Sequence, residues 1–395
     1  MNVIYVGSIY LPGQVDELKS LGSSVDFAAE TFQSSLLEGL HNYYPNLKII
    51  TAPNISNYPR ISKKLFRRKE FNLPFNNIKH IFTGFINIPI IKHISKIVRV
   101  RRAIKSSIGH DTDNKILIYG VHSPFLLALL GINKNKYKSC LIVPDLPEFM
   151  SDNKKMGYVV GKKIDRFFIN IGLKKIDSYV LFSSHMQEYL PVTNKPWINI
   201  EGIFCGESST NTSDKGSNKL ILYTGMLCKR YGIMDLINAF SLIDKDNYRL
   251  LLCGGGEAVH DITKIQEKDD RIQYLGILSK SEVRELQRKA TLLINPRHSK
   301  DKFTKYSFPS KTMEYMASGT PTLMSHLKSI PKEYEKHIYF FDDESVEGIK
   351  NKIIEICEKP QDELDAFGKA ASEFILTEKN EKKQAKKIVD LLNSL

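Results

Sequence analysis

The sequence places basic residues and glycines at the ends of short apolar runs, where they can bind an anionic ligand. The first such loop follows the run Leu220–Tyr223. It contains Gly225, which permits a tight backbone turn, and then Lys229 and Arg230, whose charges suit a phosphate group. The alternative is a solvated loop with two incidental charges, and the loop alone does not distinguish the two.

A run of three glycines at 254–256 follows the apolar run Tyr248–Cys253. Gly255, at its centre, is predicted to let a ligand phosphate approach the backbone closely. The run does not match the G-x-G-x-x-G pattern of dinucleotide sites, and glycine-rich turns are common at strand ends. By itself it is weak evidence for a ligand.

The most informative segment follows the run Leu292–Ile294. Its Arg297 is a further candidate for contact with an anion. Ser307 or Ser310 is predicted to cap a helix that starts near Pro309. The free N–H groups and the dipole of such a helix favour an anion such as a diphosphate.

Glu314 lies about one turn inside the predicted helix. A carboxylate at that place can accept hydrogen bonds from two vicinal hydroxyl groups, as on a ribose. The alternative is a surface glutamate that pairs with a neighbouring cation. The order of the three loops along the chain favours the ribose contact.

This order resembles that of retaining glycosyltransferases of the GT-B fold, specifically glycosyltransferase family four (glycosyl transferases group 1). The resemblance is closest from Leu220 to about Pro321, and 306–321 is its specific part. In that family the block starts with a Glu and carries a second Glu after seven intervening residues. Glu314 matches the second and by resemblance binds the ribose of a nucleotide sugar. Tyr306 replaces the first, which generally contacts the donor sugar, so the identity of that sugar stays open.

The resemblance also implies roles for neighbouring residues. Ser307 stands where the family usually has Gly, and both Ser307 and Phe308 are expected beside the nucleotide sugar. The family often has an Arg and a Lys in the first loop at positions that this chain fills with Met226 and Tyr231. Lys229 and Arg230 are therefore the substitute candidates for stabilising the departing diphosphate. Enzymes of this kind generally need no metal or cofactor, and the acceptor attacks from the front face.

Two residues of the first half match positions of the family, and a third is a candidate because of its place in the sequence. Gly13 lies in the loop that closes over the donor, and His122 corresponds to a histidine that touches the donor sugar. Asp145 follows another apolar run and is predicted to line the acceptor side. Without the resemblance, a lone histidine is more often structural, and Asp145 between two prolines suits a turn.

Short apolar runs alternate with helical patterns throughout, which is typical of βαβ units around a parallel sheet. The expected strands are 3–6, 47–51, 115–119, 139–143 and 178–182, then 220–223, 248–253, 272–274, 292–294, 321–324 and 338–340. The sequence thus predicts an α/β protein of the GT-B class, with two Rossmann-like, doubly wound domains facing each other across a cleft. The expected parts are an acceptor-binding domain at 1–201, a polar linker at 202–218, a nucleotide-sugar-binding domain at 219–375, and a terminal helix at 376–395 that packs on the first domain.

The composition excludes several classes of protein. The chain has 395 residues, 42% of them hydrophobic, which excludes a disordered or collagen-like protein. Its five cysteines include no C-x-x-C pair, so neither a disulfide framework nor a cysteine zinc site is expected. The first residues do not resemble a signal peptide, and no apolar segment reaches the roughly 20 residues of a membrane span. We expect a cytoplasmic protein.

The net charge of +13 is concentrated in one segment. Residues 51–110 contain 13 basic residues and one acidic residue, whereas 201–395 contain 30 of each. A helix within 89–107 is predicted to separate two kinds of side chain, with Ile90, Ile94, Ile97 and Ile104 on one face and Lys92, Lys96 and Arg99 on another. This pattern is typical of a helix on an anionic membrane, where each basic residue contributes about 1 kcal/mol. The alternatives are a core helix with a solvated basic face and a nucleic-acid surface.

The sequence therefore predicts a retaining, metal-independent glycosyltransferase that moves a sugar from a nucleotide diphosphate, UDP by family frequency, to a hydroxyl group of a saccharide. The basic segment favours a lipid-linked acceptor, as in bacterial surface polysaccharide synthesis, and a peripheral position at the inner face of the plasma membrane. A sugar-nucleotide epimerase of the GT-B fold is the alternative. A nucleic-acid-binding protein is less favoured, because it does not account for the loops in the neutral half.

Overall fold

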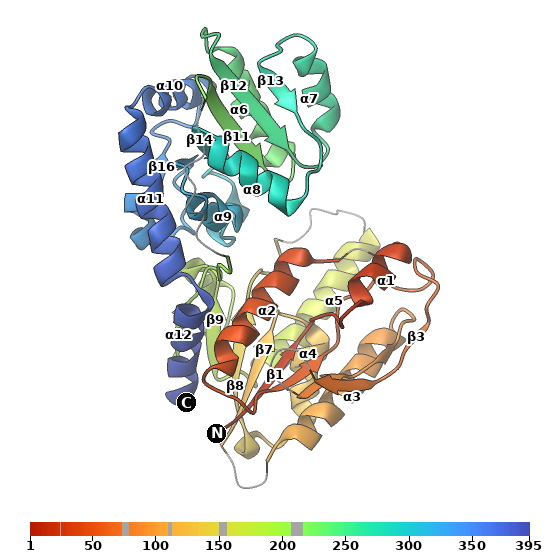
Figure 1. Ribbon diagram of the computed structural model, residues 1–395. Coiled ribbons are helices and arrows are strands. Elements are labelled where there is room, and N and C mark those ends of the chain that lie inside the picture. The colour runs from red at the N-terminus through yellow and green to blue at the C-terminus, as the bar shows by residue number, and fades with distance from the viewer. Residues whose placement is uncertain (24, 73–78, 110–112, 150–155, 207–215) are drawn as a thin grey trace. The chain divides into compact units, whose positions relative to one another are not determined.

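The computed structural model describes residues 1–23, 25–72, 79–109, 113–149, 156–206 and 216–395, which form two compact units. The first unit comprises Met1–Ile203 together with Glu381–Leu395, and the second comprises Phe204–Asn380 (Figure 1). Most of the expected linker, 207–215, lies outside the described residues. The second boundary falls a few residues after the expected 375/376, because helix α11 (Gln361–Glu378) continues to Glu378.

The first unit is built on an eight-stranded sheet with the order β10-β9-β8-β7-β1-β2-β5-β4. Neighbouring strands are parallel except for β4 and β5, which are antiparallel. The strands are β1 (Asn2–Gly7), β2 (Lys48–Thr51), β4 (Lys69–Asn72), β5 (Lys79–Phe82), β7 (Asn114–Tyr119), β8 (Lys138–Val143), β9 (Ser178–Leu181) and β10 (Trp197–Asn199). The central strands β1 and β7 are buried along almost their whole length, which explains their near-continuous apolar runs.

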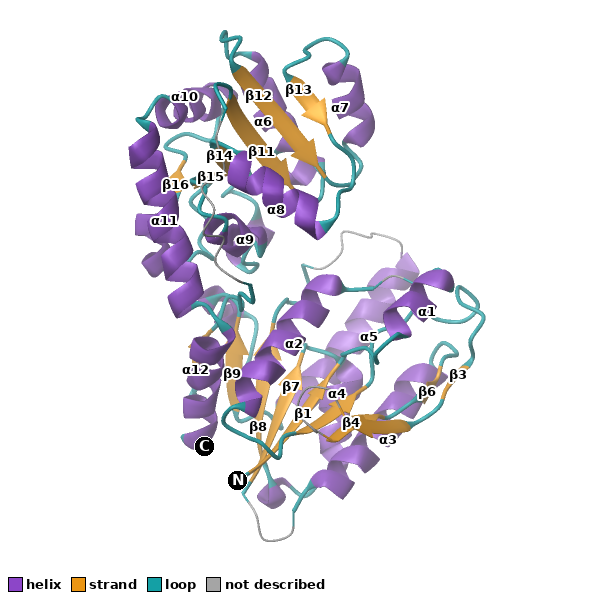
Figure 2. Ribbon diagram, in the orientation of Figure 1, coloured by secondary structure: helices purple, strands orange, loops and turns teal. Residues whose placement is uncertain are grey.

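Two groups of helices pack within this unit (Figure 2). Helix α2 (Phe27–His41) packs against α12 (Glu381–Asn393), so the end of the chain belongs to the first unit. Helix α4 (Ser123–Ala128) packs against both α3 (Ile91–Ser107) and α5 (Met156–Leu173). The short helix α1 (Gln14–Ser20) follows β1 directly.

The basic segment contains strands that were not expected from the sequence. Besides β4 and β5, strand β3 (Leu65–Phe66) pairs antiparallel with β6 (Phe85–Ile86). These strands are only two to four residues long. Such short pieces show little period-2 alternation, so the sequence pattern alone does not reveal them.

The second unit contains a parallel sheet with the order β13-β12-β11-β14-β15-β16. Counted along the chain this is 3-2-1-4-5-6, the order of a doubly wound nucleotide-binding sheet. Its strands are β11 (Lys219–Thr224), β12 (Tyr248–Cys253), β13 (Ile272–Tyr274), β14 (Leu292–Asn295), β15 (Thr322–Met324) and β16 (Tyr339–Phe340). Its helices are α6 (Ile233–Ser241), α7 (Val259–Gln266), α8 (Lys280–Lys289), α9 (Lys311–Ala317), α10 (Val346–Cys357) and α11. Every strand expected from the sequence is present in the two units, with ends shifted by about one residue.

Near the start of helix α3 the side chains point in the opposite sense to that expected, although Ile104 further along is buried. Lys92 and Lys96 are only 7% and 4% exposed, whereas Ile90 and Ile94 are 76% and 57% exposed. The lysines are tolerated inside because backbone carbonyl oxygens of the segment after β2 accept their hydrogen bonds. The prediction that Lys92 and Lys96 lie on an exposed basic face, toward a membrane or, in the alternative, toward solvent, is therefore wrong.

Candidate functional site

The loops after β11 and β12 pack directly on each other at the carboxyl edge of the second sheet. The Leu227 N–H donates to the carbonyl oxygen of Gly255 at 2.9 Å. Gly254 has a φ of 139°, and a Cβ atom there would lie 1.8 Å from the carbonyl oxygen of Gly225. The close approach of the two loops thus accounts for glycine at 254, and Gly225 and Gly255 lie in the same contact.

Lys229 and Arg230 lie in the exposed turn between Gly225 and α6, and both side chains have partners within the protein. The Lys229 amino group is 2.7 Å from a carboxylate oxygen of Asp261 in α7, and this hydrogen bond raises the pKa of Lys229. The Arg230 guanidinium lies over the ring of Phe303, 4.2 Å from its centroid. An anionic ligand would have to compete with Asp261 for Lys229.

Arg297 lies just beyond β14, and its guanidinium lies over the ring of Tyr231, 4.3 Å from the centroid. No carboxylate of the described residues forms an ion pair with it. The next residue, His298, is held by Asp235 of α6 at 2.7 Å. Arg297 is thus a positioned cation at the strand end, with its charge available to a ligand.

The block that begins at Tyr306 contains two buried aromatic residues. Tyr306 and Phe308 are 4% and 7% exposed, and the ring of Phe308 lies 5.5 Å from that of Tyr334 in an apolar cluster. The Ser307 carbonyl oxygen accepts a hydrogen bond from Ser329 at 3.1 Å. The Phe308 ring is therefore part of the packing of this unit, and the partly exposed Ser307 lies beside it.

Helix α9 starts at Lys311, slightly later than predicted, and has no serine cap. Ser310 occupies the cap position with helical backbone angles, and its side chain accepts no hydrogen bond from the helix. The Thr312 N–H instead donates to the carbonyl oxygen of Pro309 at 2.8 Å. The prediction of capping by Ser310 is therefore wrong, because the turn at Pro309 satisfies the Thr312 amide in the first turn with a backbone oxygen.

Glu314 lies at the surface of α9, with its side chain 48% exposed and a carboxylate oxygen 2.8 Å from the Lys311 amino group. This is the pairing that the surface alternative expected. The adjacent Tyr315 is fully buried and is hydrogen-bonded to Thr224, the last residue of β11. Tyr315 therefore fixes α9, and with it Glu314, at the carboxyl edge of the sheet.

The three candidates of the first unit follow three different parallel strands, and therefore lie at one edge of its sheet. Gly13 follows β1 and precedes α1 with a φ of 72°. Asp145 follows β8 and is exposed. His122 follows β7 and directly precedes α4.

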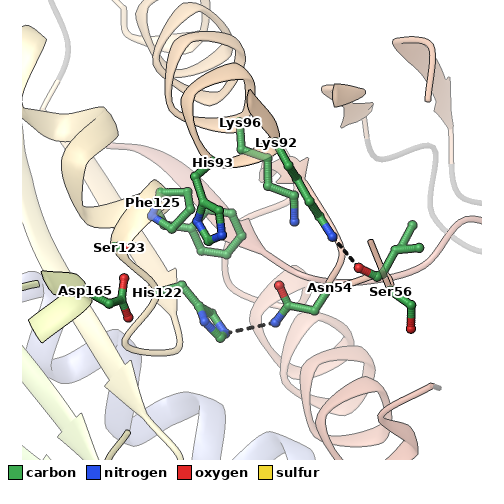
Figure 3. A pocket seen from close by; sticks show the side chains of 11 residues that line it. Asn54, Ser56, Lys92, His93, Lys96, His122, Ser123, Phe125 and Asp165 are labelled. Carbon is green, nitrogen blue, oxygen red and sulfur yellow. Dashed lines mark hydrogen bonds between the residues drawn. The ribbon is translucent and has the colours of Figure 1, made fainter. Parts of the chain in front are cut away.

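His122 is held in place from two sides (Figure 3). Its Nε2 atom lies 3.3 Å from the side-chain nitrogen of Asn54, and its ring packs edge-on against Phe125. Gly120, with a φ of 84°, makes room for the ring, because a Cβ atom there would lie 2.7 Å from Cδ2 of His122. Burial, reinforced by the charge of Lys96, lowers the pKa of His122 to about 4, so the imidazole is neutral at pH 7.

His122 also lines a cavity of about 340 Å³ in the first unit. The segment after β2, helix α3, the start of α4 and one residue of α5 surround it: Asn54, Ile55, Ser56, Lys92, His93, Lys96, His122, Ser123, Pro124, Phe125 and Asp165. Apart from His122, none of these residues was a site candidate from the sequence. The sequence contains one signal for Asn54, because this residue closely follows an expected parallel strand. It contains none for Lys92 and Lys96, which were expected on an exposed face. Among the described residues, no cluster of three His, Cys, Asp or Glu side chains is arranged to hold a metal ion.

The comparisons with known proteins agree with this architecture. Residues 207–393 match the family model described as "Glycosyl transferases group 1". No curated protein sequence matches the chain significantly. Sucrose-phosphate synthase from Thermosynechococcus elongatus is similar over 100% of this chain and 99% of its own, with a TM-score of 0.66 and 14% identity.

Two further solved structures are similar over 100% of both chains, each with a TM-score of 0.62. One is HepE from Anabaena in complex with UDP, at 13% identity. The other is TarM from S. aureus in a complex that contains UDP and α-GlcNAc-glycerol, at 12% identity. These similarities confirm the GT-B fold that the sequence predicted.

Proposed function

We propose that this protein is a glycosyltransferase that moves a sugar from a nucleotide-diphosphate donor to a hydroxyl group of a saccharide acceptor. The observation that carries the proposal is the match of residues 207–393 to the glycosyltransferase model, over a unit whose strand ends gather cations. Arg297, Lys229 and Arg230 follow two neighbouring strands, β14 and β11, of a doubly wound sheet. Ligands of such sheets bind outside the carboxyl ends of the strands.

The donor in this proposal is a UDP-sugar. Both HepE and TarM were solved with UDP, which supports this choice of nucleotide. Glu314 accepts hydrogen bonds from the ribose hydroxyl groups, and in doing so its carboxylate exchanges part of its contact with Lys311. Such an exchange costs little, because exposed ion pairs contribute about 0–1 kcal/mol.

The reaction requires the negative charge that develops on the departing diphosphate to be stabilised. Arg297 is suited to this, since its guanidinium is held over Tyr231 and forms no ion pair with a described carboxylate. Lys229 also contacts the diphosphate once its amino group has left Asp261. Arg230 adds a positive charge in the same loop. With cations in this role, the transfer proceeds without a metal ion. The acceptor attacks from the face that the diphosphate leaves, so the anomeric configuration is retained.

His122 contributes as a neutral hydrogen-bonding group beside the donor sugar. Its lowered pKa keeps the imidazole neutral at pH 7, and because Nε2 accepts from the Asn54 amide, the Nδ1–H is left to donate to the sugar. The contact with Asn54 orients the ring. Asp145 is placed on the acceptor side in this proposal, because it is exposed at the same strand edge.

The acceptor is proposed to be a lipid-linked saccharide of bacterial surface polysaccharide synthesis, used at the inner face of the plasma membrane. Large apolar side chains are exposed on the two helices that flank α4: Ile90, Ile91, Ile94 and Val98 at α3, and Val160, Ile164, Phe167 and Phe168 on α5. Nearby, exposed Arg67 and Arg68 connect strands β3 and β4, and exposed Lys69 begins β4. Apolar residues with basic neighbours suit an anionic bilayer surface. Within the described residues, no helix is long and apolar enough to span a bilayer.

A thermal-shift panel of nucleotides tests this proposal. UDP and UDP-sugars are expected to raise the melting temperature of the wild-type protein, because a ligand that binds only the folded state stabilises it. Arg297→Met is expected to reduce the shift, whereas Arg284→Met, an exposed arginine of α8, leaves it unchanged. No shift with any nucleotide diphosphate or nucleotide sugar would contradict the proposal.

A further inference from the structure

The cavity beside His122 contains two buried lysines, Lys92 and Lys96 (Figure 3). The Lys96 amino group donates to the carbonyl oxygens of Ala52 and Pro53, at 3.0 and 2.7 Å. The Lys92 amino group donates to the carbonyl oxygen of Ile55 and, at 2.8 Å, to Oδ1 of Asn57. A charged lysine has three N–H groups, so each lysine retains one with no acceptor among the described residues.

The charge in this cavity is not balanced by the protein. Neither Lys92 nor Lys96 forms an ion pair with a described carboxylate, and Asp165 is the only acidic residue among those that line the cavity. The neighbouring electrostatic contacts of Asp165 are with His93 and His122. Burying a cation without a counter-charge is costly, and a methionine would fill the same volume without that cost.

The cavity walls place these lysines near groups that can hold an uncharged part of a ligand. His122 and Asn54 line the same cavity and are in contact with each other. Ser123 and Ser56 add hydroxyl groups, and Phe125 and Pro124 add apolar surface. A volume of about 340 Å³ is in the range of small-molecule sites.

We propose that this cavity binds a phosphate group of the acceptor, with Lys92 and Lys96 as its ligands and the rest of the acceptor beside His122. The inference rests on the proposed function and adds the chemical class of the acceptor. A phosphate dianion balances the two ammonium charges and offers acceptor oxygens to the remaining N–H group of each lysine. A lipid-linked sugar phosphate and a free sugar phosphate share this group, and the experiment below separates them.

The lysines also hold the segment after β2 in place, so the test needs a readout that this structural role does not affect. Burial lowers the pKa of Lys92 to about 8 and that of Lys96 well below its usual range. A bound phosphate favours the charged forms and reverses both shifts. The other groups that face the cavity are His93, His122 and Asp165. Binding of phosphate at pH 8 is therefore accompanied by proton uptake, seen as a dependence of the binding heat on the buffer.

The experiment is calorimetry on the full chain with inorganic phosphate, glucose 1-phosphate and glucose, each with and without saturating UDP. Inorganic phosphate and glucose 1-phosphate are expected to bind both with and without UDP. Glucose is not expected to bind under either condition. Lys92→Met and Lys96→Met are expected to weaken binding at least about tenfold, since each removes a charge-assisted hydrogen bond. Lys105→Met, an exposed lysine of the same helix, is the control and is expected to leave binding unchanged.

Each further outcome has a definite meaning. A variant that keeps the circular-dichroism spectrum and the cooperative thermal unfolding of the wild-type protein is folded, and should Lys96→Met fail this criterion, Lys92→Met decides. Equal phosphate binding by the folded lysine variants, or loss of phosphate binding on addition of UDP, would overturn the inference. Lysine-dependent phosphate binding without any binding of UDP would overturn the proposed function, and with it the acceptor role. If transfer is observed, a higher kcat/KM for phosphorylated lipid extracts than for free sugar phosphates identifies the lipid-linked source, and equal use of unphosphorylated saccharides contradicts the inference.

Discussion

The hydroxyl group of Tyr315 is bonded to both backbone polar groups of Thr224. It accepts a hydrogen bond from the Thr224 N–H at 2.8 Å and donates one to the Thr224 carbonyl oxygen at 3.0 Å. Thr224 ends β11 and precedes Gly225, whereas Tyr315 follows Glu314 on α9. One buried side chain thus sets the position of α9 relative to the loop that contains Lys229 and Arg230.

Tyr315→Phe tests this relationship. The substitution leaves a buried N–H and a carbonyl oxygen without their partner, so the free energy of unfolding is expected to fall by about 1–3 kcal/mol. The affinity for UDP is expected to fall as well, because Glu314 and the β11 loop lose their common anchor. Tyr248→Phe is the matched control, since it removes a hydrogen bond to Glu358 at the opposite end of β12. It is expected to lower stability without changing UDP affinity; equal effects of both variants on UDP binding would contradict the account.

Asp261→Asn tests the role of Lys229. In the protein alone Asp261 holds the Lys229 amino group at 2.7 Å. If Lys229 binds the diphosphate, removing the competing carboxylate is expected to raise UDP affinity about two- to fivefold, the range of an exposed ion pair. Lys229→Met in the Asp261→Asn background should abolish the gain. Calorimetry that finds unchanged affinity in Asp261→Asn would remove Lys229 from the proposed site.

The pH dependence of stability tests the environment of His122. Its pKa is about 4 in the folded protein, below the ordinary value of 6.5, so the folded state binds fewer protons than the unfolded state between these values. The contribution of His122 is therefore complete above pH 6.5 and is lost as the pH falls toward 4. His122→Gln is expected to reduce the loss of unfolding free energy over this window by about 1–2 kcal/mol. The exposed His260→Gln is the control, and denaturant unfolding at several pH values is the measurement. Equal pH dependence in His122→Gln and the wild-type protein would contradict the buried, neutral imidazole.

Vesicle sedimentation tests the membrane surface. Binding to phosphatidylglycerol vesicles is expected to exceed binding to phosphatidylcholine vesicles and to weaken with salt, because the charges are screened. Ile94→Ser and Phe167→Ser are expected to weaken binding by about tenfold or more each, since each removes a side chain worth about 1.5–3 kcal/mol on burial. Leu242→Ser, an exposed leucine of the second unit, serves as the control. Vesicle binding that the first two variants leave unchanged would exclude these helices as the contact.

The fold could be predicted from the sequence because most strands of the two sheets are apolar runs, which are typical of buried parallel strands, whereas the shorter β4, β5 and β10 could not. The exposed face of α3 could not be predicted, because a lysine side chain is expected in water unless residues distant in the sequence supply hydrogen-bond acceptors. Lys92 and Lys96 find theirs in the carbonyl groups of residues 52, 53 and 55, far away in the sequence.

The same distinction applies to the candidate site. Arg297 became a candidate because it follows an expected strand, and His122 because it matches a histidine of the family that the sequence resembles. The contact of Lys229 with Asp261 joins two separate helical turns, and no local pattern indicates it. The packing of Phe308 likewise depends on Tyr334, in a different part of the second unit.

The central claim is most directly tested by release of UDP from a panel of UDP-sugars in the presence of a bacterial lipid extract, with sugar transfer to the lipid phase measured in parallel. The account predicts release and transfer with at least one donor. Glu314→Ala is expected to lower UDP release and sugar transfer at least about tenfold, because it removes hydrogen bonds to a charged group. Glu285→Ala, which changes an exposed glutamate of α8, is expected to leave both unchanged. No release from any donor, or equal release and transfer by Glu314→Ala, would contradict the account.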